Sequence, residues 1–293
     1  MTKKIDVIIP ADKGKVTPAH YIPLLEASGV DNKAFIDLAG KPMLYHVLEA
    51  VENAKFVNNI YITGLTESEI DFKFTKHVEY LPGGGDNTFD TLSSTIYYLL
   101  KKENPPEFIC NITSDIPLIT SEMIDNTIES IDWSLDADVY YTMISRKALY
   151  DKYPDVHKKP LSLTDGVFFG GDVHIFRPEA IIGRESYLRT LMERRKKFVG
   201  MARLMGPWNT FKFAFKKTSM RDITRKIWQL MGLKWAIVFA YPEFIMDLDY
   251  LDDLELFKTL CSDKSKLNDN LIKIDIVMPF TDFDSLKPKI KPL

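Results

Sequence analysis

Residues 108–115 read Phe-Ile-Cys-Asn-Ile-Thr-Ser-Asp, an apolar run followed directly by a polar pair that ends in Asp115. A short apolar run of this kind is typical of a buried strand. Similar runs occur at residues 6–10, 59–63, 77–81 and 138–144, and helical patterns lie at 42–54, 88–101 and 121–130. Strands that alternate with helices indicate right-handed crossovers. The sequence therefore predicts a three-layer α/β/α fold around a mainly parallel mixed sheet.

Polar loops follow three of these strands, after Ile9, Leu81 and Thr113, and all three are rich in Gly, Asp, Lys and Asn. In open parallel sheets, ligands bind at the carboxyl ends of the strands. The first loop, residues 11–32, is also longer than an ordinary connection, and long loops are often functional. We therefore expect a ligand site at this edge of the sheet.

The composition of the 293-residue chain is that of a globular protein, with 45% hydrophobic and 27% charged residues. The net charge of −3 favours neither nucleic acid nor a membrane as partner. Two cysteines form no metal or disulfide pattern, and no apolar stretch has the length of a signal peptide or a transmembrane helix. These features predict a cytoplasmic protein without a transmembrane segment, and they leave its oligomeric state open.

The charge is unevenly distributed along the chain. Residues 177–234 hold 15 Lys and Arg against 4 Asp and Glu, a net charge of +11. This segment includes Arg195 and Lys196, and we expect it to face an anionic partner. Aromatic and basic residues alternate at 208–217, which leaves a peripheral membrane contact open besides a structural role.

Three aspartates are candidates for holding a metal ion. Asp115 follows an apolar strand, where a carboxylate can hold Mg²⁺ together with phosphate oxygens, or simply form a turn or a helix cap. Asp247 and Asp249 share one face of an extended segment and could hold a metal ion, or they could be a solvated acidic run that caps a helix.

Several lysines and glycines are candidates for binding phosphates. Lys13, Gly14 and Lys15 could wrap phosphates through backbone N–H groups, and Lys33 could neutralise them, unless these are surface residues. Neither a Walker loop nor a GxGxxG motif is present. Residues 82–87, Pro-Gly-Gly-Gly-Asp-Asn, allow close approach of a ligand to the backbone, or form a flexible connection. Residues 165–172 are predicted to be a glycine-punctuated loop.

Three motifs in order carry a family resemblance. Residues 33–44 (Lys-Ala-Phe-Ile-Asp-Leu-Ala-Gly-Lys-Pro-Met-Leu), 113–118 (Thr-Ser-Asp-Ile-Pro-Leu) and 247–254 (Asp-Leu-Asp-Tyr-Leu-Asp-Asp-Leu) resemble the signatures of nucleotidyltransferases similar to molybdenum-cofactor guanylyltransferase. The resemblance implies the nucleotide-diphospho-sugar transferase fold. It also implies a Mg²⁺-dependent enzyme that transfers a nucleoside monophosphate from a nucleoside triphosphate to a phosphorylated acceptor and releases pyrophosphate.

The resemblance also implies roles for particular residues. Asp115 and Asp249 would bind Mg²⁺, with Asp247 as the alternative second ligand, and Lys33 and Asp115 would be catalytic. The expected nucleotide-binding residues are Ala11, Asp12, Lys13, Gly14, Lys33, Gly83, Gly84, Asn87 and Ser114. Apart from the resemblance, the glycine-punctuated stretch and the basic segment are expected to bind the anionic acceptor, through Asp165, Gly166, Gly171, Asp172, Arg195 and Lys196.

The first loop departs from the family pattern. The family pattern there is L-A-G-G-x-S-x-R-M-G, whereas residues 9–15 read Ile-Pro-Ala-Asp-Lys-Gly-Lys and contain no arginine. Two other functions therefore stay open: a glycosyltransferase that uses a nucleotide-sugar, and a family member that binds a nucleotide without turnover.

The expected organisation is a single domain over residues 1–262. Residues 1–145 would bind the nucleotide, and residues 146–262 would bind the acceptor and include a basic helical insertion at about 181–240. Residues 263–293 would be a C-terminal extension.

Overall fold

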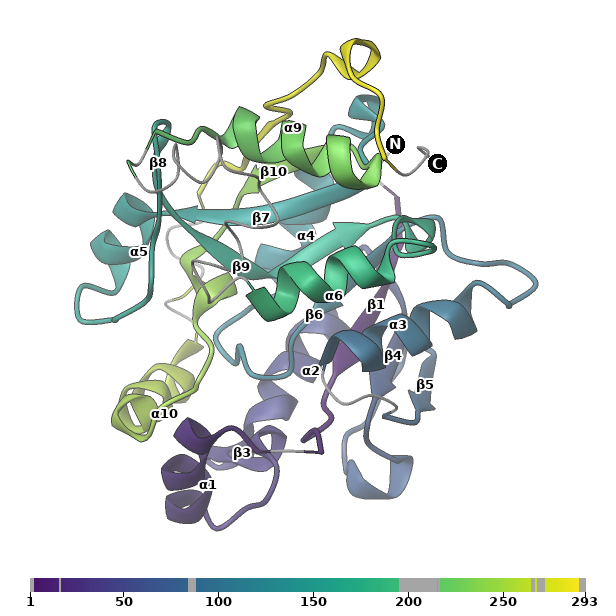
Figure 1. Cartoon of the computed structure of the whole chain (residues 1–293). Coiled ribbons are helices and arrows are strands. Elements are labelled where there is room, and N and C mark those ends of the chain that lie inside the picture. Colours follow the sequence, from purple (N-terminus) through teal and green to yellow (C-terminus); the bar gives the residue numbers. More distant parts are fainter. Residues whose placement is uncertain are drawn as a thin grey trace.

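The computed structural model of the chain describes residues 3–15, 17–83, 88–194, 215, 217–264, 267 and 272–289. Its centre is a mixed sheet with the strand order β11-β10-β7-β9-β6-β1-β4-β5, and β8 pairs with β9 (Figure 1). The strands are β1 (Ile5–Pro10), β4 (Val57–Thr63), β5 (Val78–Leu81), β6 (Ile109–Ile112), β7 (Val139–Ser145), β8 (Leu161–Leu163), β9 (Gly166–Phe176), β10 (Trp235–Phe239) and β11 (Asp275–Val277). A separate small hairpin joins β2 (Asp37–Leu38) to β3 (Lys41–Pro42).

Most of the sheet is parallel, as predicted. Strands β5, β4, β1 and β6 are paired in parallel, and so are β7 and β10. Strand β9 lies antiparallel between β6 and β7, and β11 is antiparallel to β10. Because β9 reverses direction between its neighbours, β6 and β7 point the same way and their carboxyl ends share one edge.

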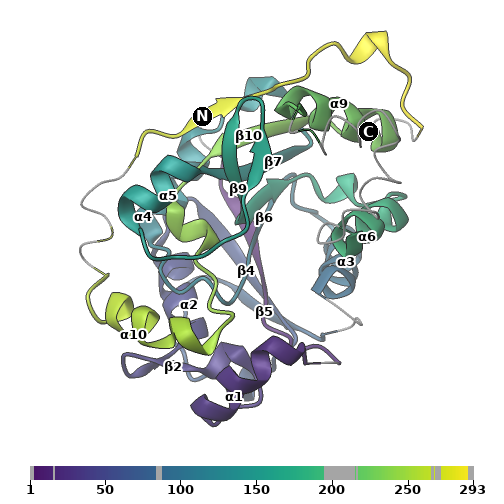
Figure 2. The same cartoon turned by 60° about the vertical axis from the view of Figure 1, so that its left-hand side comes forward.

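Helices cover both faces of the sheet (Figures 1 and 2). The helices are α1 (Ile22–Ser28), α2 (Met43–Asn53), α3 (Thr88–Leu99), α4 (Ser121–Ser130), α5 (Arg146–Lys152), α6 (Glu185–Arg194), α9 (Met220–Met231) and α10 (Leu254–Ser262). Side chains of α2 and α4 pack with Val7 and Ile9 of β1 in one core, whereas side chains of α3 and α9 pack with Ile8 in the other. Because neighbouring residues of a strand face opposite sides, this alternation confirms the three-layer arrangement.

The prediction of a loop at residues 165–172 is wrong, because most of this stretch is the first half of β9. Its glycines make room for side chains of the neighbouring strand β7. A Cβ atom at Gly170 would lie 2.5 Å from the Tyr141 hydroxyl, and one at Gly171 would lie 2.3 Å from Thr142 Oγ1. The glycines were therefore a sign of close strand packing, not of a loop.

Residues 11–32, expected to be a continuous loop, contain a 3₁₀ turn at Ala19–Tyr21 and the helix α1. Helix α1 begins with a proline in its first turn, Pro23, and ends at Gly29 in the left-handed conformation. These are ordinary start and stop signals that the high polarity of the stretch obscured.

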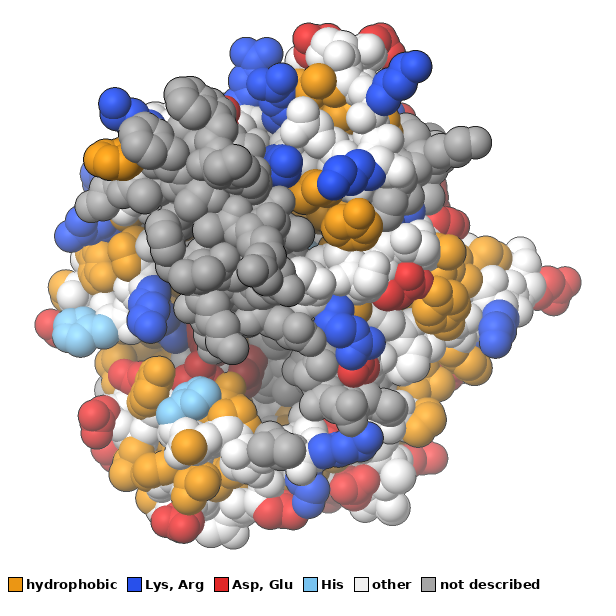
Figure 3. Space-filling model, viewed as in Figure 1, with side chains coloured by type: hydrophobic (Ala, Val, Ile, Leu, Met, Phe, Trp, Pro, Cys, Tyr) orange, Lys and Arg blue, Asp and Glu red, His pale blue; other side chains and the backbone are white. Residues whose placement is uncertain are grey.

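The segment assigned to a basic insertion contributes to the main layers of the fold. Helix α9 packs on the sheet, and β10 pairs in parallel with β7. Strand β11, from the segment expected to be a C-terminal extension, pairs with β10. Helix α9 lies near the top of the view in Figure 1, on the opposite side of the molecule from α1, and Figure 3, in the same view, shows Lys and Arg side chains on the upper part of the surface.

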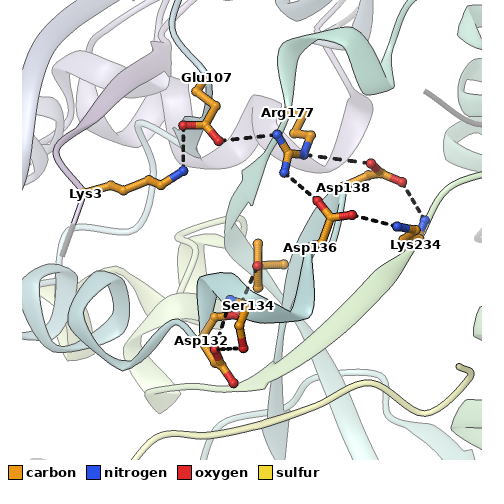
Figure 4. A network of polar contacts seen from close by, with 9 residues as sticks. Lys3, Glu107, Asp132, Ser134, Asp136, Asp138, Arg177 and Lys234 are labelled. Atoms are coloured by element: carbon orange, nitrogen blue, oxygen red, sulfur yellow. Dashed lines mark hydrogen bonds and ion pairs between the residues drawn. The ribbon is translucent and has the colours of Figure 1, made fainter. Parts of the chain in front are cut away.

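An ion-pair network holds the amino ends of the parallel strands (Figure 4). Arg177 contacts Asp136 at 2.9 Å and Glu107 at 3.4 Å. Lys3 completes the chain of contacts at 2.6 Å from Glu107, and Lys234 lies 2.7 Å from Asp136. This network ties β1, β9 and β10 together at the edge away from the loops that were expected to bind ligands.

The carboxyl end of β4 comes very close to the first loop. Gly64, with φ +90°, is so near Asp12 that a Cβ atom would lie 2.4 Å from Asp12 Cβ and 2.6 Å from its Cα. Gly29 has φ +67° but nothing within 4 Å of a Cβ atom. The two glycines therefore separate the effect of backbone conformation from that of crowding.

We expect Gly29→Ala to lower the free energy of unfolding by about 1–2 kcal/mol, the cost of a left-handed alanine. Gly64→Ala should lower it by about 3 kcal/mol or more, because Asp12 must also move. Urea unfolding of both variants measures the difference. Equal losses would show that the first loop does not pack against β4 as described.

Candidate active site

Three carboxylates meet at the carboxyl edge of the sheet. Asp115 follows β6, while Asp247 and Asp249 lie in the segment between β10 and α10. The backbone N–H of Leu248 donates a hydrogen bond to the carbonyl oxygen of Asp115 at 3.1 Å, which fixes the two segments side by side. One oxygen of each carboxylate lies within 4.8 Å of the others, and all three residues are half-buried.

Lys33 lies between two of these carboxylates. Its Nζ atom donates to Asp115 Oδ2 at 2.9 Å and to Asp249 Oδ1 at 2.6 Å, and its side chain is only 12% exposed. The backbone at this position is fixed by Asn32. The Asn32 side chain accepts from Ala34 N and donates to Ala11 O, both at 3.0 Å, so it joins the Lys33 turn to the end of β1.

Lys158 is a site residue that the sequence analysis missed. Its Nζ atom donates to Asp247 Oδ1 at 2.5 Å and to the Asp247 carbonyl oxygen at 3.0 Å. It comes from the segment between α5 and β8, where the sequence reads His-Lys-Lys-Pro and offers no motif. Only the fold brings this lysine to the carboxylates.

Tyr21 covers Lys33 from the first loop. The Lys33 ammonium lies 4.1 Å from the centre of the Tyr21 ring, a cation–π distance. Burial raises the pKa of Tyr21, which stays a neutral phenol beside the cluster. The lysine is thus enclosed by one aromatic ring and two carboxylates.

The surroundings of the site shift the pKa values of its lysine and its carboxyl groups in different directions. Burial tends to lower the pKa of Lys33, but Asp115 and Asp249 outweigh it and raise that pKa. Burial tends to raise the pKa of Asp249, but Lys33 outweighs it and lowers that pKa to about 2. Burial, Asp115 and Asp249 together raise the pKa of Asp247 to about 6 despite Lys158. Asp249 is therefore ionised at any ordinary pH, whereas Asp247 titrates close to neutrality.

The carboxylate cluster fits a divalent cation. Mg²⁺ prefers carboxylate and phosphate oxygens and keeps several waters, so two or three convergent carboxylates are an adequate protein share. Asp115, Asp247 and Asp249 supply such oxygens within 4.8 Å of one another. No histidine or cysteine belongs to this group, so the donor set is a hard one.

The expected phosphate-binding loop is held by contacts of its own. Asp12 Oδ1 accepts a hydrogen bond from the Gly14 N–H at 2.7 Å, and Lys13 pairs with exposed Asp31 at 2.6 Å. The Ala11 N–H donates to the carbonyl oxygen of Thr63 at 2.9 Å. Gly83, at the end of β5, would place a Cβ atom 2.3 Å from Asp12 Oδ2. The loop therefore lies at the site edge, but two of its candidate binding groups face other protein groups.

The expected acceptor residues do not form one group. The carbonyl oxygen of Asp172 accepts from the N–H of Thr113, two residues before Asp115, at 3.4 Å, and Ser114 between them in sequence is half-buried. Gly171 packs against Thr142. Asp165 and Gly166 lie at the turn between β8 and β9, where Asp165 Oδ2 accepts from the Met220 N–H at the start of α9. Gly84, Asn87, Arg195 and Lys196 lie outside the described residues.

Comparisons with known proteins identify related sequences. Residues 25–148 match the family model described as Cytidylyltransferase, a range that includes Lys33 and Asp115. A 2-C-methyl-D-erythritol 4-phosphate cytidylyltransferase from Petrotoga mobilis is 28% identical over 102 residues. This match covers 33% of the chain and 44% of the relative, so less than half of the relative's length is represented.

Solved structures show the same fold over most of the chain. A hypothetical transferase from Thermus thermophilus has a TM-score of 0.70 at 20% identity, and the match covers 86% of this chain and 99% of that one. A 4-diphosphocytidyl-2C-methyl-D-erythritol synthase from Anaerococcus prevotii has a TM-score of 0.53 at 15% identity, and the match covers 90% of this chain and 100% of that one. These likenesses confirm the expected α/β fold of the nucleotide-diphospho-sugar transferase type, and the sequence matches support a nucleotidyltransferase.

None of the helices in the described part of the chain has the length and apolar character needed to cross a membrane.

The pKa of Asp247 leads to a prediction for metal binding. A carboxyl group must lose its proton before it can bind a cation. The affinity for Mn²⁺, used as a spectroscopic probe, should therefore fall as the pH is lowered from about 7.5 to about 5, most steeply near 6. Asp247→Asn should bind Mn²⁺ more weakly at the higher pH and lack the steep step. A wild-type affinity that is flat through pH 6 would exclude Asp247 from the cation site.

Proposed function

We propose that this chain is a magnesium-dependent nucleotidyltransferase that transfers CMP from CTP to a phosphorylated small-molecule acceptor and releases pyrophosphate. The observation that carries this proposal is the arrangement at the sheet edge, where Lys33 lies 2.9 Å from Asp115 and 2.6 Å from Asp249. Carboxylates at the strand ends can hold the cation that accompanies a nucleoside triphosphate, and a lysine beside them can bind its phosphates.

The residues of the site divide the work of the reaction. Asp115 and Asp249 would hold Mg²⁺, with Asp247 as the alternative or third ligand. The cation, when bound, would neutralise charge on the phosphates. Lys33 would bind the triphosphate. The acceptor phosphate oxygen, already ionised at neutral pH, would attack the α-phosphorus of CTP. A new P–O bond would form there as the bond between the α-phosphorus and the oxygen bridging to the β-phosphate breaks, and pyrophosphate would leave. Positioning and charge compensation suffice, and no general base is needed.

Cytosine is the proposed base because the family model and the Petrotoga mobilis relative are both cytidylyltransferases. The resemblance of residues 33–44 and 113–118 to molybdenum-cofactor guanylyltransferase would instead favour guanine. A phosphorylated acceptor is supported by the relative's name, which specifies an erythritol 4-phosphate. A cytoplasmic location, without contact to nucleic acid, is part of the same proposal.

A second candidate function is nucleotide binding without turnover. The observation that favours it is the first loop, where Asp12 accepts from the Gly14 N–H and Lys13 pairs with Asp31. In this arrangement the Gly14 N–H and the Lys13 ammonium both have protein partners. The two functions differ in one product, because only a nucleotidyltransferase releases pyrophosphate.

We expect CTP with Mg²⁺ to stabilise the protein against thermal unfolding, by about 2.7 kcal/mol at a concentration 100 times its dissociation constant. UTP, ATP and GTP should stabilise it less. Asp115→Asn should abolish the effect because the cation loses a ligand. Asp275→Asn is the control, because Asp275 is an exposed carboxylate on β11, 3.9 Å from Lys273. This variant should keep the stabilisation by CTP and Mg²⁺.

The same proteins, incubated with CTP and a set of sugar and polyol phosphates, should release pyrophosphate with wild type and Asp275→Asn only. Binding of CTP without pyrophosphate from any acceptor would favour the second candidate function. Stabilisation by GTP alone would replace cytosine by guanine. No stabilisation by any nucleoside triphosphate would contradict both functions.

A further inference from the structure

Lys33 occupies the place between two carboxylates where a cation would be bound. Its Nζ atom lies within hydrogen-bond distance of Asp115 Oδ2 and Asp249 Oδ1, and these residues belong to the three-carboxylate cluster. An ammonium group and a divalent cation that use the same oxygens compete for them. We propose that Lys33 is the resident counter-cation of this cluster, so that a divalent cation binds tightly only when a polyphosphate draws Lys33 away.

Charge balance supports this inference. Without a cation, Asp115, Asp247 and Asp249 face the ammonium groups of Lys33 and Lys158, so three negative charges meet two positive ones. A divalent cation added to this arrangement would lie a few ångströms from Lys33, and like charges at that distance repel strongly in a half-buried site. Departure of Lys33 removes the repulsion and frees both carboxylate oxygens.

The surroundings allow the Lys33 side chain to leave while its backbone stays in place. Asn32 holds the turn against the end of β1 through Ala34 and Ala11, so the position of the Cα atom is fixed. Among the described residues, the ammonium is held by two carboxylates and the face of the Tyr21 ring. If the Lys33 ammonium leaves Asp115 and Asp249, its positive charge must be compensated by another anion within reach of the side chain.

The first loop begins beside Lys33, because its first residue, Ala11, accepts a hydrogen bond from the side chain of the neighbouring Asn32 at 3.0 Å. A polyphosphate bound along this loop would supply the anion that Lys33 requires, and a cation bridging its phosphates would take the vacated oxygens. Cation and polyphosphate would then strengthen each other's binding by the same factor, as linkage requires. The identity of the polyphosphate as CTP rests on the proposed function, but the competition between Lys33 and a cation does not.

The test measures Mn²⁺ affinity from the electron paramagnetic resonance signal of free Mn²⁺, first without nucleotide. Lys33→Met keeps most of the length of the side chain and removes its charge, and it should bind Mn²⁺ at least about tenfold more tightly than wild type. Lys33→Arg keeps the charge and should bind as weakly as wild type. Lys41→Met serves as the matched control, because Lys41 pairs with Glu49 in an exposed ion pair and should leave the affinity unchanged.

In the second arm, α,β-methylene-CTP, a non-cleavable analogue, should tighten Mn²⁺ binding to wild type by about tenfold or more and to Lys33→Met by much less. Equal or weaker Mn²⁺ binding by Lys33→Met without nucleotide would overturn the inference. Lys33→Gln replaces Lys33→Met if thermal unfolding shows that the methionine variant is not folded. An analogue that does not bind would contradict the proposed function, while the first arm would still decide the inference.

Discussion

The structure depends on the compensation of three converging carboxylates by two lysines. Asp115, Asp247 and Asp249 lie within 4.8 Å of one another in a half-buried position, and like charges so placed would repel without partners. Lys33 and Lys158 supply the partners from two further segments. The cap at Asn32 and the hydrogen bond from Leu248 to Asp115 hold these segments in register. The fold therefore brings four distant parts of the chain to one site, where the two lysines compensate the three carboxylates.

Much of this arrangement could be predicted from the sequence, because Asp115 follows an apolar strand and such strand ends share an edge in a parallel sheet. Lys33 and Asp249 could be placed beside Asp115 only through the resemblance to nucleotidyltransferase motifs, because 216 positions of sequence separate the two residues. Lys158 could not be predicted, because a lysine in an irregular segment carries no pattern that shows which way it points. The error at residues 165–172 has a similar origin: glycine marks both loops and crowded strands, and the crowding by Tyr141 and Thr142 exists only in the folded sheet.

The first loop departs from the expected family pattern, because residues 9–15 contain no arginine. Asp12 occupies the narrow space next to Gly64 and Gly83, and it ties down the Gly14 N–H. The Lys33 and Asp115 motifs, by contrast, lie inside the range that matches the cytidylyltransferase family. A cluster of three carboxylates therefore lies at the sheet edge beside a first loop that departs from the expected family pattern.

The most direct test of this account is a crystal structure with α,β-methylene-CTP and Mn²⁺, in which anomalous scattering locates the metal. The account predicts a manganese peak bound by Asp115 and Asp249, the triphosphate along residues 11–15, and Lys33 Nζ on a phosphate oxygen instead of the two carboxylates. A structure in which the nucleotide binds elsewhere, or in which Lys33 still bridges Asp115 and Asp249 beside a bound nucleotide, would contradict it.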